Sequence, residues 1–278
     1  MPELPEVETV RRGLEVALVG RRMTTARATG ARTVRRTSAA AVEAGLMGAT
    51  ATAAERRGKY LLVPLDNGLA MLVHLRMSGQ LLVVPAGAAV VKHTHVVVGL
   101  DGGDELRFVD PRTFGEVVVI DPEHLADDAP DLVALGPDAL ELAAGPPRAL
   151  AALLGSRSRM LKYALTDQRT LAGLGNIYAD EVLHRARLAP QRVSSTLTTT
   201  EARRLHRSLG DVLGEAIEAR GSSLADAQYV DLWGEAGSFR ERHRVYGRAG
   251  QRCLRCKATV VSAKWAGRTT AWCPGCQT

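Results

Sequence analysis

Residues 253–276 read CLRCKATVVSAKWAGRTTAWCPGC and contain all four cysteines of the 278-residue chain. The cysteines form two Cys-x-x-Cys pairs, Cys253 with Cys256 and Cys273 with Cys276, and residues 257–272 separate the pairs. This spacing predicts four thiolates around one metal on a β-hairpin, because each tight pair supplies two ligands from a single turn. Four thiolates leave no open coordination position, so we expect one structural Zn²⁺. Two disulfides or uncommitted thiols are the alternatives.

Basic residues are concentrated around this cysteine module. Residues 239–278 contain nine Lys or Arg residues and one acidic residue, Glu241, whereas the whole chain has a formal net charge of +6. Such a concentration favours a surface that binds phosphate groups over an ordinary solvated face. We expect the hairpin to project the basic groups of KWAGRTT, residues 264–270, toward a phosphate.

The composition is that of a folded protein without a membrane segment. Hydrophobic residues make up 46% of the chain and charged residues 24%, which are ordinary values for globular domains. No stretch resembles a signal peptide or a membrane span, and the cysteines lie in one module rather than in a disulfide framework. We therefore expect a cytoplasmic protein that does not bind membranes.

The first 130 residues have the pattern of a sheet-rich domain. A helix is predicted over residues 5–19, because Pro5 suits a first turn and Val7, Val10 and Leu14 recur at helical spacing. Strand-like segments follow in pairs: YLLVPL and LAMLVHL flank the turn signal DNG, THVVVGL and ELRFVD flank a glycine pair, and GEVVVI comes next. The pattern predicts a two-layer β structure with one long N-terminal helix.

An acidic, proline-containing connector then leads into a helical pattern that runs from residue 137 to about residue 219. Within it, Gly175 and Asn176 precede the helix expected in LAGLGNIYADEVLHRA. Free N–H groups at such a helix start can bind an anion, and ordinary turn chemistry is the alternative. The predicted division is a catalytic domain (1–130), a helical domain (137–222), a loop region (223–243) and a zinc module (244–278).

Eight segments in order carry a resemblance to the bacterial formamidopyrimidine-DNA glycosylase family and cover residues 2–277: PELPEVETVRRGL, RRGKYLL, HLRMSGQL, KHTHV, FVDPRTFGE, LTDQRTLAGLGNIYADE, VYGR and GRTTAWCPGCQ. The resemblance implies an α+β multidomain fold: an N-terminal β-sandwich, a helix–two-turn–helix domain and a Cys₄ zinc finger. It also implies base excision repair by a glycosylase and AP lyase that removes oxidised purines (8-oxoguanine, formamidopyrimidines) and cleaves the strand by β,δ-elimination.

The implied partner is double-stranded DNA that contains oxidised bases or abasic sites. The protein would be a monomer, nucleoid-associated when it is bound to DNA, with no redox or nucleotide cofactor.

The start of the chain suits this chemistry. Removal of Met1 would give Pro2 a free secondary amine with a pKa near ~8, so about a tenth of it is unprotonated and nucleophilic at pH 7. Attack on a sugar C1′ gives a charged iminium that acidifies the C2′ proton, and Glu3 can act as acid and then as base. The alternative is that Pro2 only permits the removal of methionine.

By resemblance, Lys59 donates a proton in β-elimination, and Arg268 does so in δ-elimination while it binds phosphate; simple phosphate contact is the alternative for both. The family fills the space of a flipped nucleotide with residues that match Met77, Arg112 and Phe114. Residues 222–239 correspond to the loop that closes over the damaged base. Other matches to DNA-contacting positions are His74, His93, Arg157, Lys162, Asn176 and Tyr246.

Two positions depart from the family pattern. Thr113 stands where a second basic residue is common, so one phosphate or strand contact is expected to be missing, and Arg76 stands where glycine is common. Arg76 is expected either to contact a phosphate or to point to solvent.

Two other functions compete with this interpretation. An endonuclease VIII-like enzyme for oxidised pyrimidines shares the nucleophile, but Leu4 departs from its usual PEGPE opening. A non-catalytic nucleic-acid-binding zinc protein would have no use for Pro2, Glu3 and Lys59 together.

Overall fold

The computed structural model describes residues 1–156, 158–224, 229–265 and 267–278. These residues form two compact units. The first unit comprises Met1–Ala134 and Ala219–Ser238, and the second comprises Leu135–Glu218 and Phe239–Thr278. Among the described residues, no helix is both long and apolar enough to cross a membrane.

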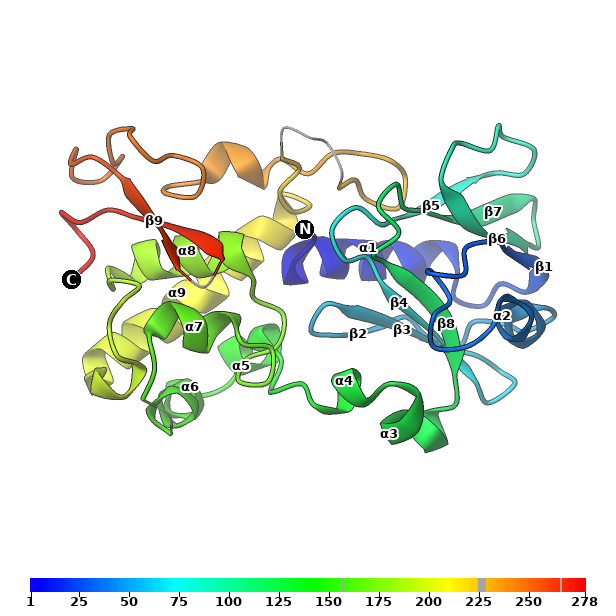
Figure 1. The fold of residues 1–278 in the computed structure, drawn as a ribbon, viewed down its shortest axis with the longest axis horizontal. Coiled ribbons are helices and arrows are strands. Elements are labelled where there is room, and N and C mark those ends of the chain that lie inside the picture. The colour runs from blue at the N-terminus through cyan, green and yellow to red at the C-terminus, as the bar shows by residue number, and fades with distance from the viewer. Residues whose placement is uncertain (157, 225–228, 266) are drawn as a thin grey trace. The chain divides into compact units, whose positions relative to one another are not determined.

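The first unit contains two antiparallel sheets, each of four strands in the part of the chain described (Figure 1). One sheet has the order β1 (Met23–Ala28), β6 (Thr94–Leu100), β7 (Asp104–Val109) and β5 (Gln80–Pro85). The other has the order β2 (Glu55–Arg57), β3 (Tyr60–Pro64), β4 (Ala70–His74) and β8 (Glu116–Ile120). The predicted hairpins are present: Tyr60–Pro64 pairs with Ala70–His74, and Thr94–Leu100 pairs with Asp104–Val109.

One apolar core joins the two sheets to the first helix, α1 (Leu4–Ala17). Pro5 stands in the first turn of α1, where its missing N–H costs nothing, and Val7, Val10 and Leu14 are fully buried. Leu61 and Val73 of one sheet and Val96 and Phe108 of the other complete the same cluster. A second helix, α2 (Ala39–Leu46), starts at Ser38, whose side chain accepts a hydrogen bond from the Ala41 N–H.

The predicted connector carries short helical turns: η1 (Pro122–His124), α3 (Leu125–Asp128) and α4 (Pro130–Val133). Proline begins two of these turns, which are too short to show a periodic pattern in the sequence. The strands β1 and β5 were not predicted either, because their outer residues are partly exposed and their sequences lack clean alternation.

The second unit is helical, as predicted, and ends in a β-hairpin. Its helices are α5 (Ala139–Ala144), α6 (Pro147–Gly155), α7 (Leu161–Thr166), α8 (Asn176–Ala186) and α9 (Thr199–Glu218), with the 3₁₀ turns η2 (Ser194–Thr196) and η3 (Phe239–Arg242). The hairpin consists of β9 (Val261–Trp265) and β10 (Arg268–Trp272), and Trp265 stacks on Trp272 with ring centroids 5.1 Å apart.

The two units group the chain differently from the four parts expected from the sequence. Residues 219–238 pack with the first unit, and the cysteine module packs with the helices of the second. The four-part division stays a prediction.

Candidate functional site

The first residues of the chain are fixed by one buried carboxylate, that of Glu6. Glu3 is the N-cap of α1, and its backbone N–H donates to Glu6 Oε2 at 2.7 Å. The Ser222 N–H donates to the other oxygen, Glu6 Oε1, also at 2.7 Å. Gly221, with φ 78°, lies so close that a Cβ there would sit 2.7 Å from Glu6 Oε1. Glu6 therefore ties the turn that carries Pro2 and Glu3 to the start of the 222–239 loop.

Lys59 lies in the turn between β2 and β3, directly before Tyr60, the first residue of β3. Tyr60 pairs with His74 across β3 and β4, and their rings meet edge to face with centroids 4.4 Å apart. The Arg76 backbone N–H donates to His74 Nδ1 at 2.9 Å. Burial, together with the positive charges of Arg76 and Lys59, holds the pKa of His74 well below its usual range. The imidazole is therefore neutral, and Nε2 carries its hydrogen as a donor.

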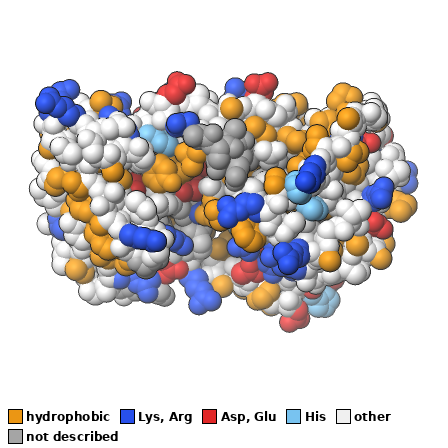
Figure 2. Space-filling view, turned by 45° about the horizontal axis from the view of Figure 1, so that its top comes forward, with side chains coloured by type: hydrophobic (Ala, Val, Ile, Leu, Met, Phe, Trp, Pro, Cys, Tyr) orange, Lys and Arg blue, Asp and Glu red, His pale blue; other side chains and the backbone are white. Residues whose placement is uncertain are grey.

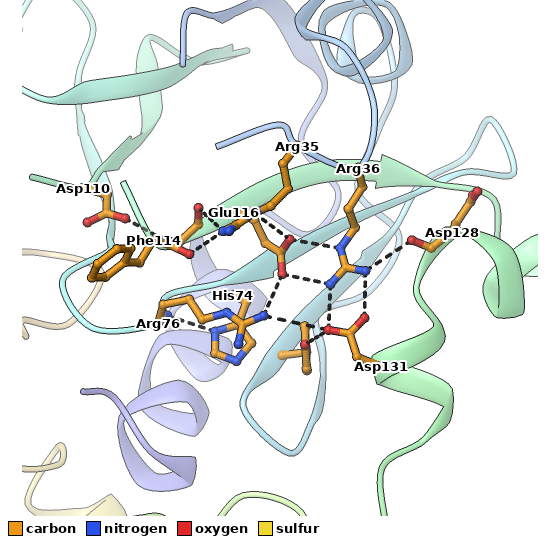
Figure 3. Close-up of polar contacts among 11 residues, drawn as sticks. Arg35, Arg36, His74, Arg76, Asp110, Phe114, Glu116, Asp128 and Asp131 are labelled. Carbon is orange, nitrogen blue, oxygen red and sulfur yellow. Dashed lines mark hydrogen bonds and ion pairs between the residues drawn. The ribbon is translucent and has the colours of Figure 1, made fainter. Parts of the chain in front are cut away.

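The side chain of Arg76, which is 39% exposed, belongs to a partly buried charge cluster with Glu116 and Asp131 (Figure 3). Its Nη2 lies 3.4 Å from Glu116 Oε1 and 3.8 Å from Asp131 Oδ2. Arg36 bridges the same two carboxylates, with its Nε 3.0 Å from Glu116 and its Nη1 2.7 Å from Asp131.

The hydroxyl of Tyr60 completes the cluster by donating to Asp131. The hydrogen bond from Arg36 holds the pKa of Asp131 below its usual range, and burial raises the pKa of Tyr60. Through Tyr60 and Arg76, this cluster fixes both neighbours of His74. A residue of the connector, Asp131, thus helps to set the surroundings of the Lys59 turn.

The residues expected to replace a flipped nucleotide lie on two adjacent loops that cross from one sheet to the other. The loop from β4 to β5 carries Met77, and the loop from β7 to β8 carries Arg112 and Phe114. Met77 is 39% exposed and Phe114 is 45% exposed, although both are large apolar side chains. The Arg112 guanidinium lies 5.0 Å from the centre of the Phe114 ring. Their exposure distinguishes Met77 and Phe114 from the buried apolar residues of the core.

A single carboxylate, that of Asp110, holds both crossing loops. It is fully buried and accepts from Ser78 Oγ at 2.5 Å, from the Arg112 N–H at 3.1 Å and from the Gly115 N–H at 2.7 Å. Gly79 and Gly115 both approach the Phe108 ring, and a Cβ at either would lie within 2.9 Å of its tip.

Thr113 takes φ 54° in the turn of the second loop. Its conformation is one that favours glycine or asparagine, so this position serves the turn and not strand pairing.

The structure says less about His93 and Arg157, two residues that are expected to contact DNA. His93 precedes β6 with φ 68°, and its carbonyl accepts from the Asp110 N–H at 3.0 Å. Its backbone therefore supports the Asp110 loop. Arg157 lies outside the residues that the structure describes.

In the second unit, Asn176 and Arg268 come together at the junction of α8 with the hairpin. Asn176 is the first residue of α8, and its Nδ2 donates to the Thr269 carbonyl at 2.6 Å, next to Arg268 on β10. Lys162 lies beneath this junction and is 1% exposed. Its Nζ donates to the Asn176 carbonyl at 2.8 Å and to Asp180 Oδ1 at 2.6 Å. In this structure Lys162 supports the Asn176 turn, and its expected contact with DNA stays a prediction.

Two neighbouring carboxylates of α8 organise the rest of this surface. Asp180 Oδ2 accepts from the Ala271 N–H of β10 at 3.0 Å, and burial raises the pKa of Asp180 to about 6 despite Lys162. Glu181 accepts from the backbone N–H groups of Arg244, Val245 and Tyr246 at 2.8–3.0 Å. Burial raises the pKa of Glu181 as well. These contacts fix the backbone that carries Tyr246.

The four cysteines form a cluster that fits a tetrahedral metal. All four are free thiols, and their sulfur atoms lie within 4.8 Å of one another. Cys256 Sγ lies 3.3 Å from Cys273 Sγ, and Cys253 Sγ lies 3.9 Å from Cys276 Sγ. Sulfurs at about 2.3 Å from a tetrahedral Zn²⁺ would be roughly 3.8 Å apart, so the donor set and its size suit zinc. None of the four cysteines forms a disulfide in this structure.

Comparison with known proteins adds to this geometry. Residues 1–117 match the formamidopyrimidine-DNA glycosylase N-terminal domain, and residues 135–228 match the formamidopyrimidine-DNA glycosylase H2TH domain. The chain belongs to the formamidopyrimidine-DNA glycosylase family. It is 45% identical to a formamidopyrimidine-DNA glycosylase of Salinispora arenicola over all of this chain and 96% of that one.

Solved structures of formamidopyrimidine-DNA glycosylases have the same fold. One is the Lactococcus lactis protein in complex with DNA that contains an abasic site, with a TM-score of 0.87 and 33% identity over 99% of each chain. Another is a MutM protein in complex with DNA that contains carbocyclic 8-oxo-G, with a TM-score of 0.87 and 32% identity over the whole of both chains. The family resemblance and the fold class expected from the sequence are therefore confirmed, and the protein is a DNA glycosylase of DNA repair.

Four carboxylates of this glycosylase have a positioning role that the sequence did not reveal: Glu6, Asp110, Asp180 and Glu181. Each is buried and accepts at least one hydrogen bond from a distant segment: from the Ser222 N–H, the Ser78 hydroxyl, the Ala271 N–H and the N–H groups of residues 244–246, respectively. The available signal was the placement of Asp180 and Glu181 inside the apolar stripe of a helix, since a carboxylate rarely stands there without a partner.

Proposed function

We propose that this glycosylase excises oxidised purines, 8-oxoguanine and formamidopyrimidines, and then cleaves the DNA strand as an AP lyase. The observation that carries the proposal is the N-terminal turn: Glu6 holds Glu3, and with it Pro2, against the first residues of the 222–239 loop. A nucleophile and the loop expected to cover the base thus have one common anchor. The relatives in complex with abasic-site and 8-oxo-G DNA support the same substrate class.

The chemistry begins with removal of Met1, which frees the Pro2 amine. Its pKa near ~8 leaves a usable unprotonated fraction at neutral pH. The nitrogen attacks C1′ of the sugar and loses its proton, the bond from C1′ to the base breaks, and the base departs with a proton. Glu3 protonates the ring oxygen as the sugar opens, which leaves an iminium between Pro2 and C1′.

The iminium draws electrons from the neighbouring carbons of the sugar. Loss of the C2′ proton expels the 3′ phosphate in β-elimination, and a second proton loss expels the 5′ phosphate in δ-elimination. Lys59 assists the first step and Arg268 the second, as proton donors at the departing phosphates. Glu3 takes up protons as the base, because its carboxylate is ionised after it has given its proton to the sugar.

Phosphate binding is divided among groups whose orientation is fixed locally. The neutral His74 presents an Nε2–H donor beside Lys59, because the Arg76 N–H occupies Nδ1. Tyr246 contributes from a backbone held by Glu181, and Asn176 from the start of α8. Such contacts make binding fall steeply with salt concentration.

Lesion recognition uses the two crossing loops of the first unit. Phe114 and Met77 wedge into the base stack in place of the flipped nucleotide, and Arg112 donates to the orphaned cytosine. Met77 and Phe114 are already exposed in the protein without DNA, so neither side chain has to leave the protein core before it inserts between bases. His93 and Arg157 add contacts to the DNA strands.

The metal proposed for the cysteine cluster is one Zn²⁺, held by Cys253, Cys256, Cys273 and Cys276. When bound, it supplies structure and no step of the reaction, since four thiolates close its coordination sphere. It keeps the hairpin rigid beneath Arg268. Metal analysis of the purified protein should give about one zinc per chain, and a folded protein without metal would contradict the assignment.

The proposed enzyme acts as a monomer in the cytoplasm, at the nucleoid when bound to DNA, without a redox or nucleotide cofactor. Mass measurement in solution tests the monomer: a single 29.7 kDa species is expected.

The substrate class is tested with two duplexes that differ in one lesion, 8-oxoguanine opposite cytosine and thymine glycol opposite adenine. We expect faster cleavage at 8-oxoguanine, with a phosphate left at both ends of the gap as β,δ-elimination requires. Preference for thymine glycol would favour the endonuclease VIII-like function instead. Phe114→Ala should slow cleavage of the 8-oxoguanine duplex more than cleavage of a single strand that already contains an abasic site.

A further inference from the structure

His184 stands in the last turn of α8, and its ring faces the cysteine cluster. The side chain is buried, with 2% of the residue exposed. Its Nε2 lies 3.5 Å from Cys253 Sγ and 3.7 Å from Cys276 Sγ. These two sulfurs belong to different Cys-x-x-Cys pairs, so one ring nitrogen of the helical domain meets both halves of the metal module.

The surroundings of the ring decide which nitrogen carries the hydrogen. His184 Nδ1 is buried and has no hydrogen-bond partner among the residues that the structure describes. A hydrogen on Nδ1 would be buried without an acceptor, and the Nε2 lone pair would face two electron-rich sulfurs. A hydrogen on Nε2 points instead at those sulfurs, which are acceptors in a metal-bound cluster because cysteine binds zinc as a thiolate. The second tautomer is favoured.

A hydrogen bond from His184 Nε2–H would stabilise the negative charge of the metal-bound thiolates. Four thiolates around Zn²⁺ leave two excess negative charges in a partly buried site, and hydrogen bonds to the sulfurs spread that charge. The Arg255 backbone N–H donates to Cys253 Sγ at 3.4 Å from within the module. The donor from His184 comes from another element, α8, whose first residue, Asn176, contacts the hairpin at its far end.

We propose that His184 is a positioning residue for the metal module: its Nε2–H donates to the Cys253 and Cys276 thiolates and raises zinc affinity while it fixes the module to α8. The inference rests on the proposed zinc site. Partners of this kind typically change metal affinity by about 10–100-fold. Because sulfur is a weak acceptor and Cys253 keeps the Arg255 donor, we expect an effect near the lower end, about tenfold.

Three variants of the full-length protein separate the hydrogen bond from packing. His184→Phe keeps a ring of similar size without any N–H, and His184→Gln keeps an N–H donor near the position of Nε2. His206→Phe is the matched control, since His206 lies on α9 and its Nε2 contacts the Leu142 carbonyl at 3.1 Å, away from the cysteines. Each protein is challenged with the chromogenic chelator 4-(2-pyridylazo)resorcinol, and zinc transfer is followed by absorbance.

We expect His184→Phe to lose zinc affinity by about tenfold, and His184→Gln and His206→Phe to stay within about twofold of the native protein. In the cobalt-substituted proteins, the sulfur-to-cobalt charge-transfer band of His184→Phe should move to longer wavelength, because thiolates without a hydrogen bond release electrons more readily. A purely structural role of the ring would leave this band unchanged.

The two proposals fail in different ways. Native protein that is folded but holds no metal would overturn the zinc site itself. Native protein with one zinc, together with the same affinity and the same cobalt band in His184→Phe, would overturn the role of His184 alone. A Phe variant that does not fold leaves the test to His184→Gln: its affinity must stay near native, and a tenfold loss there contradicts donation from Nε2.

Discussion

Asp110 of the first unit and Asp180 of the second each hold neighbouring segments together by accepting hydrogen bonds, but from different kinds of partner. Each is a buried carboxylate beneath a surface expected to bind DNA. Asp110 accepts from a serine hydroxyl and two backbone N–H groups. Asp180 instead forms an ion pair with the buried Lys162 and accepts from one backbone N–H.

The two surfaces are held by different kinds of interaction. Around Asp110 the donors are neutral, and they belong to the two loops that carry Met77, Arg112 and Phe114. Removal of one of these donors is expected to loosen a loop and to leave the sheets in place. Around Asp180 a second charge is buried with it, so the pair is sensitive to the loss of either partner. Substitutions at Asp110 should therefore change function more than stability, and substitutions at Asp180 the reverse.

The largest effect is expected for Asp180→Asn. The amide removes the carboxylate charge that pairs with the buried Lys162 ammonium, which should lower the free energy of unfolding by about 3–5 kcal/mol. Urea denaturation measures this loss. In Lys162→Met/Asp180→Asn the ammonium is also gone, while the amide oxygen can still accept from the Ala271 N–H. The double variant should recover most of the stability, and failure to do so would mean that the ion pair is not the source of the loss.

A smaller change in stability, with a larger change in function, is expected for Asp110→Asn. The amide –NH₂ faces groups that donated hydrogen bonds to the carboxylate, so one of these bonds is lost. The free energy of unfolding should therefore fall by about 1–3 kcal/mol. Cleavage of the 8-oxoguanine duplex should fall about tenfold or more, because misplaced loops weaken the wedge. Asp101→Asn is the control: Asp101 is an exposed carboxylate of the same unit that pairs with Arg21. Equal activity losses in both variants would contradict a specific role for Asp110.

The smallest effect is expected for Asp131→Asn and depends on pH. Arg36 lowers the pKa of Asp131 in the folded state, so its contribution to stability is present above the ordinary carboxyl pKa near ~3.9 and is lost as the pH falls below it. The side chain is 43% exposed, which limits the contribution to about 1 kcal/mol at pH 7. The difference in thermal stability between native and variant protein should be largest at pH 7 and should shrink progressively as the pH falls below ~3.9. A constant difference would contradict the ion pair as its cause.

The same comparison shows what the sequence could predict. The Cys-x-x-Cys spacing predicted the cluster, and helical spacing from Val7 to Leu14 predicted α1, because both signals are local. Asp180 meets Lys162 and the Ala271 N–H, and Asp110 meets the Ser78 hydroxyl of another loop, so no local pattern could name these distant partners. Lys162 illustrates the same limit: its motif did not reveal that the fold buries its ammonium beside Asp180, and its contact with DNA stays a prediction. Arg76 became interpretable only when β4 and β8 brought Glu116 beside it.

The covalent link between Pro2 and deoxyribose is tested most directly by reduction with borohydride during reaction with an 8-oxoguanine duplex. We predict one protein–DNA adduct for the native chain, with the added mass on the peptide that begins at Pro2, and little adduct for Pro2→Gly or for protein that keeps Met1. No adduct, or an adduct that maps to a lysine such as Lys59, would contradict the proposed nucleophile.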